Sequence, residues 1–236
     1  MSLLWRHALP PRPGVRGPKQ TLDVDTVVRT AVTIADRDGY DKISIRTVAA
    51  ELGLRPMSLY TYVPSKEALI VLMVDAVADE DTPISPDLSA RERMSAIAHQ
   101  IRTEILTHPW LLEVPPWRQV LGPGRSRRYE RQLEAIDNIG LSDLDMDRTL
   151  AILTEFATGN ARMAVAATRS AADMTDAQWW EVHGPLLEKV MPADRFPLSS
   201  RVGSTAGEVY QAPGDPTGSF EYGLTRLLDG IEAHLA

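Results

Sequence analysis

The stretch Ser44–Val63, SIRTVAAELGLRPMSLYTYV, decides the fold of this chain. It holds two short helical segments, and Gly53 lies at the tight turn between them, where a left-handed backbone favours glycine. Ala49 is the small residue that a steep helix crossing requires. The apolar positions of the core between the segments are all filled, by Val48, Leu52, Leu54, Leu59 and the pair Tyr62–Val63. This pattern predicts a helix-turn-helix, and an ordinary helical hairpin with the same core is the alternative.

Helical patterns flank this motif on both sides. One helix before it is predicted by six apolar residues at helical spacing, which are Val24, Val27, Val28, Ala31, Ile34 and Ala35. Gly39 ends this helix, and Ser44 caps the start of the next one. The third helix is expected over residues 56–62 and the fourth over residues 66–78. Two prolines then mark a break near residues 79–88.

The remainder of the chain also has helical patterns. Ser89 and Glu92 form a capping box ahead of an apolar stripe that ends at Pro109. A short turn and four further helices are expected over residues 110–113, 126–139, 145–172, 176–190 and 219–235. Residues 192–218 are rich in Pro, Gly and Ser and are expected to form a long loop. Alternating strand patterns are nearly absent, so the expected fold class is all-α.

The chain is expected to divide into three parts. Residues 1–21 hold four prolines and two glycines beside basic residues, Arg16 and Lys19 among them, which is the composition of a flexible basic arm. Residues 22–79 are expected to form a three-helix domain that contains the helix-turn-helix. Residues 80–236 are expected to form a larger helical domain.

Charge is distributed unevenly between the two ends. Residues 1–66 hold ten Lys and Arg against six Asp and Glu, a net charge of +4, whereas residues 67–236 hold 15 against 26, a net charge of −11. A basic head on an acidic body confines attraction for a polyanion such as DNA to one end, and chance asymmetry is the alternative. Either the arm places Arg16 or Lys19 in a minor groove, or it is a tail without function.

Several functional classes are disfavoured by the sequence. The chain has no cysteine, which excludes disulfides and thiolate chemistry and fits a reducing cytosol. No run of about 18 apolar residues exists, so no membrane span is expected and the expected location is the cytoplasm. The metalloprotease, hydrolase, P-loop and dinucleotide-binding motifs are all absent, which makes an enzyme the least favoured class. Neither a metal nor a cofactor is expected.

The stretch Ser44–Leu54, together with Ser58-Leu59-Tyr60 and Lys66-Glu67-Ala68-Leu69, resembles the DNA-binding signature of the TetR family of repressors. The resemblance extends more weakly to the C-terminal part, where His108-Pro109-Trp110 and Phe220-Glu221-Tyr222-Gly223-Leu224 resemble the tetracycline-repressor-type regulatory domain. It implies a homodimeric repressor that binds a double-stranded DNA operator and is released by a small hydrophobic effector. An effector-independent regulator and an activator remain open alternatives.

The resemblance implies roles for the residues of the motif. Those that would face base edges in the major groove are Arg55, Met57, Ser58, Thr61 and Tyr62. Arg46 matches a position that reaches a guanine. Those that resemble phosphate contacts are Ser44, Thr47, Tyr60 and Lys66. Packing is the alternative role for Tyr60, and simple solvation is the alternative for Lys66. Arg55, followed by Pro56, departs from the small polar cap of the family, so it is either a base or a phosphate contact.

The resemblance also implies a dimer held by a four-helix bundle of the last helices. Gly223 and Gly230 would let a partner helix approach closely, and packing within the chain is the alternative. The residues expected to line a ligand pocket, with plain core packing as the alternative, are Trp110, Trp117, Phe156, Met163, Trp179, Trp180 and His183. The adjacent side chains of Trp179 and Trp180 point about 100° apart on a helix, so one of them is expected to meet a ligand, a partner or water.

A bound metal–drug complex is disfavoured. The tetracycline-binding branch of the family uses one histidine after the fourth helix and another near the break after the short sixth helix. Residues 79–84 and 113–124 of this chain contain no histidine. A magnesium–tetracycline effector is therefore not expected.

Overall fold

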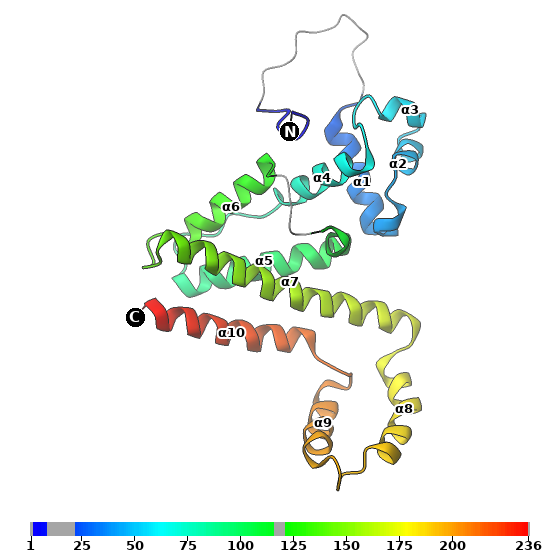
Figure 1. The fold of residues 1–236 in the computed structure, drawn as a ribbon, viewed down its shortest axis with the longest axis vertical. Helices are drawn as coiled ribbons and strands as arrows, with labels where there is room; N and C mark the ends of the chain where they lie inside the picture. Colours follow the sequence, from blue (N-terminus) through cyan, green and yellow to red (C-terminus); the bar gives the residue numbers. More distant parts are fainter. Residues whose placement is uncertain (1, 9–21, 116–120, 236) are drawn as a thin grey trace, which may run out of the picture.

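The computed structural model describes residues 2–8, 22–115 and 121–235, and their regular structure is helical (Figure 1). No strand occurs within these ranges, so the predicted all-α class is confirmed. Among the helices described, none has a stretch long and apolar enough to cross a membrane.

The N-terminal helices build the helix-turn-helix. Their bounds are α1 Val24–Asp38, the 3₁₀ turn η1 Tyr40–Lys42, α2 Ile45–Glu51, α3 Pro56–Leu59 and α4 Lys66–Val77. The side chains of Asp23, Ser44 and Ser65 accept backbone N–H bonds as N-caps of α1, α2 and α4. Gly53 adopts a φ of 66° in the turn after α2, the left-handed region that favours glycine. The predicted motif is therefore formed, with α3 regular over a shorter stretch than expected.

An apolar core holds the helix-turn-helix together. Ala49 is fully buried, as the steep crossing of α2 requires. Val48, Leu59 and Val63 are buried with side chains of α1 and α4. Trp110 joins the same core, although it lies beyond the break expected near residues 79–88.

Further helices pack into a second core. Their bounds are α5 Ala90–Thr107, the 3₁₀ turn η2 Pro109–Glu113, α6 Pro123–Ile136, α7 Asp143–Asp173, α8 Asp176–Val190, α9 Pro197–Tyr210 and α10 Pro216–Leu235. The capping box of Ser89 and Glu92 is present with both of its hydrogen bonds. α5 packs along α7, and α10 lies against both of them (Figure 1). α6 contacts α4, α5 and α7, so it lies between the two cores.

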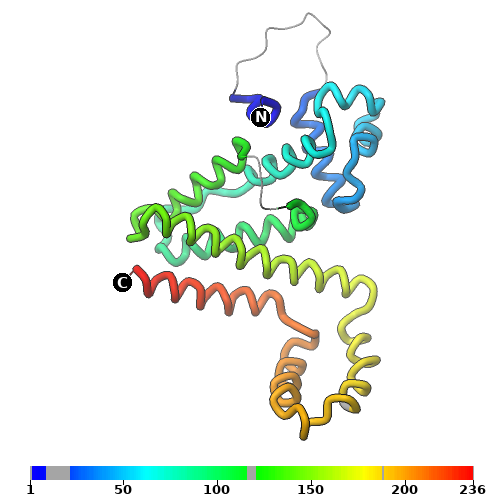
Figure 2. The backbone as a smooth tube through the Cα atoms, in the orientation of Figure 1, coloured from blue at the N-terminus to red at the C-terminus, as the bar shows by residue number. Residues whose placement is uncertain are grey.

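α8 and α9 form a pair that projects away from the rest of the protomer (Figure 2). α8 spans the predicted residues, but the prediction of a loop over residues 192–218 is wrong, because α9 lies within it. Pro197 stands in the first turn of α9, where its missing N–H has no helical partner to lose. Gly203 and Gly207 lie in open space on the same helix, and no residue of α9 is buried.

Residues 2–8 form turns that pack against the N-terminal helices. Leu4 is 3% exposed and belongs to the first core. The indole N–H of Trp5 donates to the carbonyl of Leu121, just before α6, at 3.1 Å. These residues differ from the flexible arm predicted for residues 1–21, because their apolar side chains bury themselves in an existing core.

Candidate functional site

Most of the ten residues expected to touch DNA are exposed in the helix-turn-helix. Of the ten, those with exposed side chains are Arg46, Arg55, Met57, Ser58, Tyr60 and Thr61. Met57 is 75% exposed, which leaves a large apolar side chain available to a partner. Arg37, at the edge of the motif, forms an ion pair with Glu51. The part of the chain that the structure describes offers no such carboxylate to Arg46 or Arg55.

The other residues expected at DNA are half-buried and partly engaged in structure. Ser44 accepts a hydrogen bond from the amide of Thr47 at 3.0 Å, and the two hydroxyl oxygens lie 2.7 Å apart. Tyr62 packs against the first core. The Nζ of Lys66 lies 5.2 Å from the ring centroid of Tyr40, a cation–π contact between α4 and η1. The arm residues Arg16 and Lys19 lie outside the described residues.

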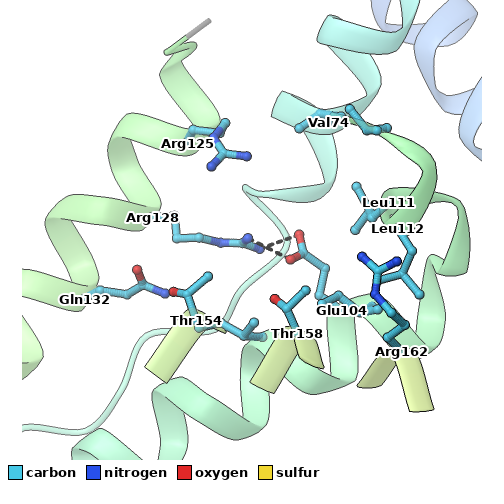
Figure 3. A pocket seen from close by; sticks show the side chains of 13 residues that line it. Val74, Glu104, Leu111, Leu112, Arg125, Arg128, Gln132, Thr154, Thr158 and Arg162 are labelled. Atoms are coloured by element: carbon cyan, nitrogen blue, oxygen red, sulfur yellow. Dashed lines mark hydrogen bonds and ion pairs between the residues drawn. The ribbon is translucent and has the colours of Figure 1, made fainter. Parts of the chain in front are cut away.

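A cavity of about 230 Å³ lies among α4, α5, α6 and α7 (Figure 3). Its apolar wall consists of Val74, Ile101, Ile105, Leu111, Leu112 and Val114. Its polar wall consists of Glu104, Arg125, Arg128, Gln132, Thr154, Thr158 and Arg162. A hollow with an apolar wall on one side and converging polar groups on the other is suited to a small organic ligand that has a polar group.

Arg128 is held by carboxylates from two other segments. Its guanidinium donates to Glu104 at 2.7 and 2.8 Å, and its Nε forms an ion pair with Asp81 at 2.6 Å. Burial alone would lower the pKa of Arg128, but the hydrogen bonds and charges of these two carboxylates raise it. Burial raises the pKa of Asp81 despite the attraction of Arg128. Arg128 therefore fastens α6 to α5 and to the segment after α4.

Asp75 of α4 holds the start of α6. Its buried carboxylate accepts hydrogen bonds from the amides of Gly124 at 3.2 Å and Arg125 at 3.0 Å. A negative charge at this end also complements the helix dipole. A Cβ at Gly122 would lie 2.2 Å from the carboxylate, and a Cβ at Gly124 would lie 2.0 Å from the carbonyl oxygen of Asp75. The close approach of α4 and α6 therefore requires glycine at both positions.

A second link joins η2 to α1. The indole N–H of Trp110 donates to Asp36 at 2.8 Å, and the Nδ1 of His108 lies 2.8 Å from the same carboxylate oxygen. Trp110 is only 2% exposed, so it is a core residue of the N-terminal unit. It does not line the cavity described above.

Two more residues expected in the pocket also lie elsewhere. Phe156 stacks on Phe220 with ring centroids 5.4 Å apart, inside the second core. Its ring fills the space over Gly223, where a Cβ would lie 2.7 Å from it. Gly223 is therefore used for packing within the chain. Met163 is 62% exposed on α7.

The remaining expected pocket residues are gathered on α8. Trp179 stacks on His183 with ring centroids 4.3 Å apart, and Trp180 meets Trp179 edge-on at 4.9 Å. α8 projects from the rest of the protomer (Figure 1), and none of these three residues lines the cavity. Trp117 lies outside the described residues.

The polar wall of the cavity was not among the residues expected from the sequence. Arg125 and Arg128 are three residues apart on α6, and Thr154 and Thr158 are four apart on α7. Such spacings put each pair on one helix face, so the signal is present in the sequence. It is weak, because polar residues at these spacings are also typical of a solvated helix face.

Comparisons with known proteins agree with this architecture. Residues 27–73 match the family described as bacterial regulatory proteins, tetR family, and residues 82–235 match the tetracyclin repressor-like C-terminal domain. The HTH-type transcriptional repressor DrrR1 of Streptomyces coeruleorubidus is 36% identical over 240 residues, covering 100% of this chain and 86% of that protein.

Solved structures of the Streptomyces coelicolor TetR family protein ActR are also similar. The ActR complex with actinorhodin has a TM-score of 0.75 at 28% identity, covering 92% of this chain and 98% of that one. The complex with (S)-DNPA has a TM-score of 0.72 at 27% identity, covering 92% of this chain and 100% of that one. Because the C-terminal family alone accounts for more than half of the residues and the DrrR1 match covers all of them, the chain belongs to the TetR family of transcriptional regulators.

Proposed function

We propose that this chain is a ligand-responsive transcriptional repressor, which binds operator DNA as a homodimer and releases it when a small-molecule effector fills the cavity. The observation that carries the proposal is the double role of α4. This helix follows the helix-turn-helix directly, lines the cavity through Val74 and holds α6 through Asp75. One rigid element therefore touches both the DNA-reading unit and the cavity.

The relatives support both halves of the proposal. DrrR1 is named a repressor, and ActR has been crystallised with small molecules. All of these relatives are regulators, so no catalytic role is proposed for the chain. Operator DNA lies in the bacterial cytoplasm, and the proposal assigns the protein to that compartment.

In this proposal the exposed face of α2 and α3 enters the major groove. Arg46 and Arg55 have guanidinium groups suited to the two acceptors of a guanine edge. The other residues proposed to face bases are Met57, Ser58, Thr61 and Tyr62. The residues proposed to contact phosphates and set the register are Ser44, Thr47, Tyr60 and Lys66.

The homodimer is proposed to form through the C-terminal helices. Large apolar side chains that stay exposed in the protomer gather on α7 to α10, and they include Leu144, Ile152, Met163, Val182, Leu186, Val190, Leu198, Val202, Val209 and Tyr222. So many exposed apolar side chains are typical of a surface that a partner covers. A Cβ at Gly230 on α10 would meet nothing within 4 Å, which leaves room for a partner helix there.

Release follows from a change in the spacing of the two recognition helices. Half-sites one helical turn apart lie about 34–36 Å from each other, and both protomers must match that distance. An effector releases DNA only if it binds more tightly to the conformation with another spacing. A shift of α6 relative to α4 is the proposed step, because Asp75 couples them directly.

Operator binding tests the proposal. The purified protein is titrated against a labelled fragment of its own upstream region and against a scrambled fragment of the same composition, at several salt concentrations. The proposal expects saturable binding to the first fragment, and expects at least one compound from a small-molecule panel to abolish it. Failure to select any site, from this region or from random DNA, would contradict the proposal. Selective binding that no compound changes would instead favour an effector-independent regulator.

A further inference from the structure

The polar wall of the cavity is basic. Arg125, Arg128 and Arg162 all line it, and Glu104 is the acidic side chain of the lining. Both oxygens of Glu104 already accept hydrogen bonds from Arg128. The lining therefore leaves Arg125 and Arg162 without a carboxylate, which is unexpected for a cavity that holds only an apolar molecule.

The side chain of Arg125 has unused donors beside the cavity. Its backbone amide donates to Asp75, but within the described ranges no oxygen accepts a hydrogen bond from its guanidinium. Burial lowers the pKa of Arg125, and the nearby charge of Arg128 lowers it further. The charges of Glu104 and Asp75 raise it in part, and the guanidinium keeps its proton, so its half-buried side chain carries a full positive charge with unused donors at the cavity.

Arg162 approaches the same space from the other side. It projects from α7 beside Leu112, whereas Arg125 projects from α6, and Figure 3 shows the Arg128–Glu104 pair between the two arginines. In the part of the chain that the structure describes, no carboxylate forms an ion pair with Arg162. Leu111 and Leu112 of η2 close the cavity with an apolar surface next to it.

We infer that the effector is an acidic amphipathic molecule, whose carboxylate or similar anionic group binds Arg125, while the charge of Arg162 attracts it from the other side of the cavity and its apolar body lies against Leu111 and Leu112. The inference rests on the proposed function and narrows its effector from a hydrophobic compound to an acidic one. A guanidinium recognises a carboxylate through two parallel hydrogen bonds, which gives direction as well as affinity. A neutral compound of the same shape would leave both cations unpaired.

Two dyes with the same ring system separate charge from apolar contact. The anionic probe is anilinonaphthalene sulfonate, and the neutral probe is N-phenylnaphthylamine, which lacks the sulfonate. Fluorescence titrations are run on the full-length wild type and on the variants Arg125→Met, Arg125→Lys and Arg162→Met. The matched control is Arg127→Met, since Arg127 lies on the same helix but pairs with Asp79 outside the cavity.

The wild type is expected to bind the sulfonate at least tenfold more tightly than the neutral dye. Arg125→Met should weaken the sulfonate about 10- to 100-fold, the factor expected for a charge-assisted hydrogen bond, and should leave the neutral dye within about twofold. Arg125→Lys should weaken sulfonate binding by an intermediate factor, because lysine keeps the charge but lacks the two parallel N–H donors of a guanidinium. Arg162→Met, at an exposed position that leaves folding intact, should also weaken only the sulfonate. The Arg127→Met control should match the wild type.

The outcomes separate this inference from the proposed function. Equal affinity for the two dyes, or unchanged sulfonate binding in both the Arg125→Met and Arg162→Met variants, would overturn the acidic effector. Absence of binding by either dye would overturn it as well, because the cavity would then hold no such ligand. Operator binding by the same wild-type preparation, measured without dye, tests the proposed function alone. If the protein binds its operator but shows no preference for the anionic dye, only the inference is rejected.

Discussion

Substitution of Gly122 by alanine is expected to destabilise the protein through a single carboxylate. The added Cβ would lie 2.2 Å from the Oδ1 of Asp75, so this carboxylate has to move. It would then leave the amides of Gly124 and Arg125, which it now reaches at 3.2 and 3.0 Å. A hydrogen bond to a charged group contributes about 1.5–3 kcal/mol, and the freed amides regain some water, so the expected loss in the free energy of unfolding is about 2–4 kcal/mol. The φ of Gly122 is −95°, which alanine adopts freely, so backbone strain is not the cause.

The variant Asp75→Ala isolates this contact. By itself it loses the same two hydrogen bonds and should also cost about 2–4 kcal/mol. In its background, Gly122→Ala meets no carboxylate, so its further cost should fall below about 1 kcal/mol, a coupling free energy of about 2 kcal/mol. Gly124→Ala should remain costly in both backgrounds, because its Cβ would lie 2.0 Å from the backbone carbonyl oxygen of Asp75.

Urea unfolding followed by circular dichroism measures these free energies. The protomer concentration is held fixed, because the stability of a dimer depends on it. Gly203→Ala on α9 is the matched control: no atom lies within 4 Å of its added Cβ, and it should be neutral or stabilising by up to about 1 kcal/mol. Additive costs for Gly122→Ala and Asp75→Ala, or rescue of Gly124→Ala by Asp75→Ala, would refute the idea that this contact sets the approach of α4 and α6.

Four further substitutions test the DNA contacts, the link between η2 and α1, and the ion pair of Asp79. Arg46→Ala should cost about 1–3 kcal/mol of operator affinity and relax the preference at one base position. Lys66→Ala should weaken binding to all sequences alike and lower the slope of log affinity against log salt concentration by about 1. Anisotropy titrations on operator variants measure both effects, and unchanged binding in a variant would refute the role assigned to that residue. Trp110→Phe removes a 2.8 Å hydrogen bond to a carboxylate of α1 and should cost about 1–2 kcal/mol in urea unfolding, so an unchanged midpoint would contradict that link. The hydrogen bond from Arg127 lowers the pKa of Asp79, so this pair stabilises the fold above the unfolded pKa of about 3.9 and is lost as pH falls through the lower folded value. Between pH 5 and pH 3, the free energy of unfolding should therefore fall less in Asp79→Asn than in the wild type. The difference should be under about 1 kcal/mol, because the pair is partly exposed. An equal fall in both proteins would contradict a stabilising role for this pair.

Local signals explain why the helix-turn-helix could be predicted. Gly53 in the left-handed region, the cap at Ser44 and the buried Ala49 each act over a few residues of chain. The capping box at Ser89 and the span of α8 follow from rules of the same short range. Where the physical cause lies within one turn of helix, the residue types alone are informative.

The close approach of two helices in the folded protein explains why the cavity could not be predicted. It depends on α6 reaching α4 through Asp75 and two glycines far away in sequence, and no local pattern marks that approach. Aromatic residues gave a misleading signal for the same reason. Trp110 and Phe156 fill the two cores, whereas Trp179 and Trp180 contact each other on a projecting helix. The helix α9 escaped detection because proline in a first turn and glycine on an exposed face are compatible with a helix but typical of loops.

The central claim is that a compound in the cavity controls the operator through α4. Its most direct test is the fluorescence anisotropy of labelled operator bound to the full-length protein, titrated with aromatic acids and their neutral counterparts. We predict that an acid releases the operator from the wild type, and that Arg125→Met needs about tenfold or more of the same acid to release the same fraction of the operator that it binds without compound. An acid that displaces the dye from the cavity of the wild type and leaves the operator bound at saturation would contradict the claim.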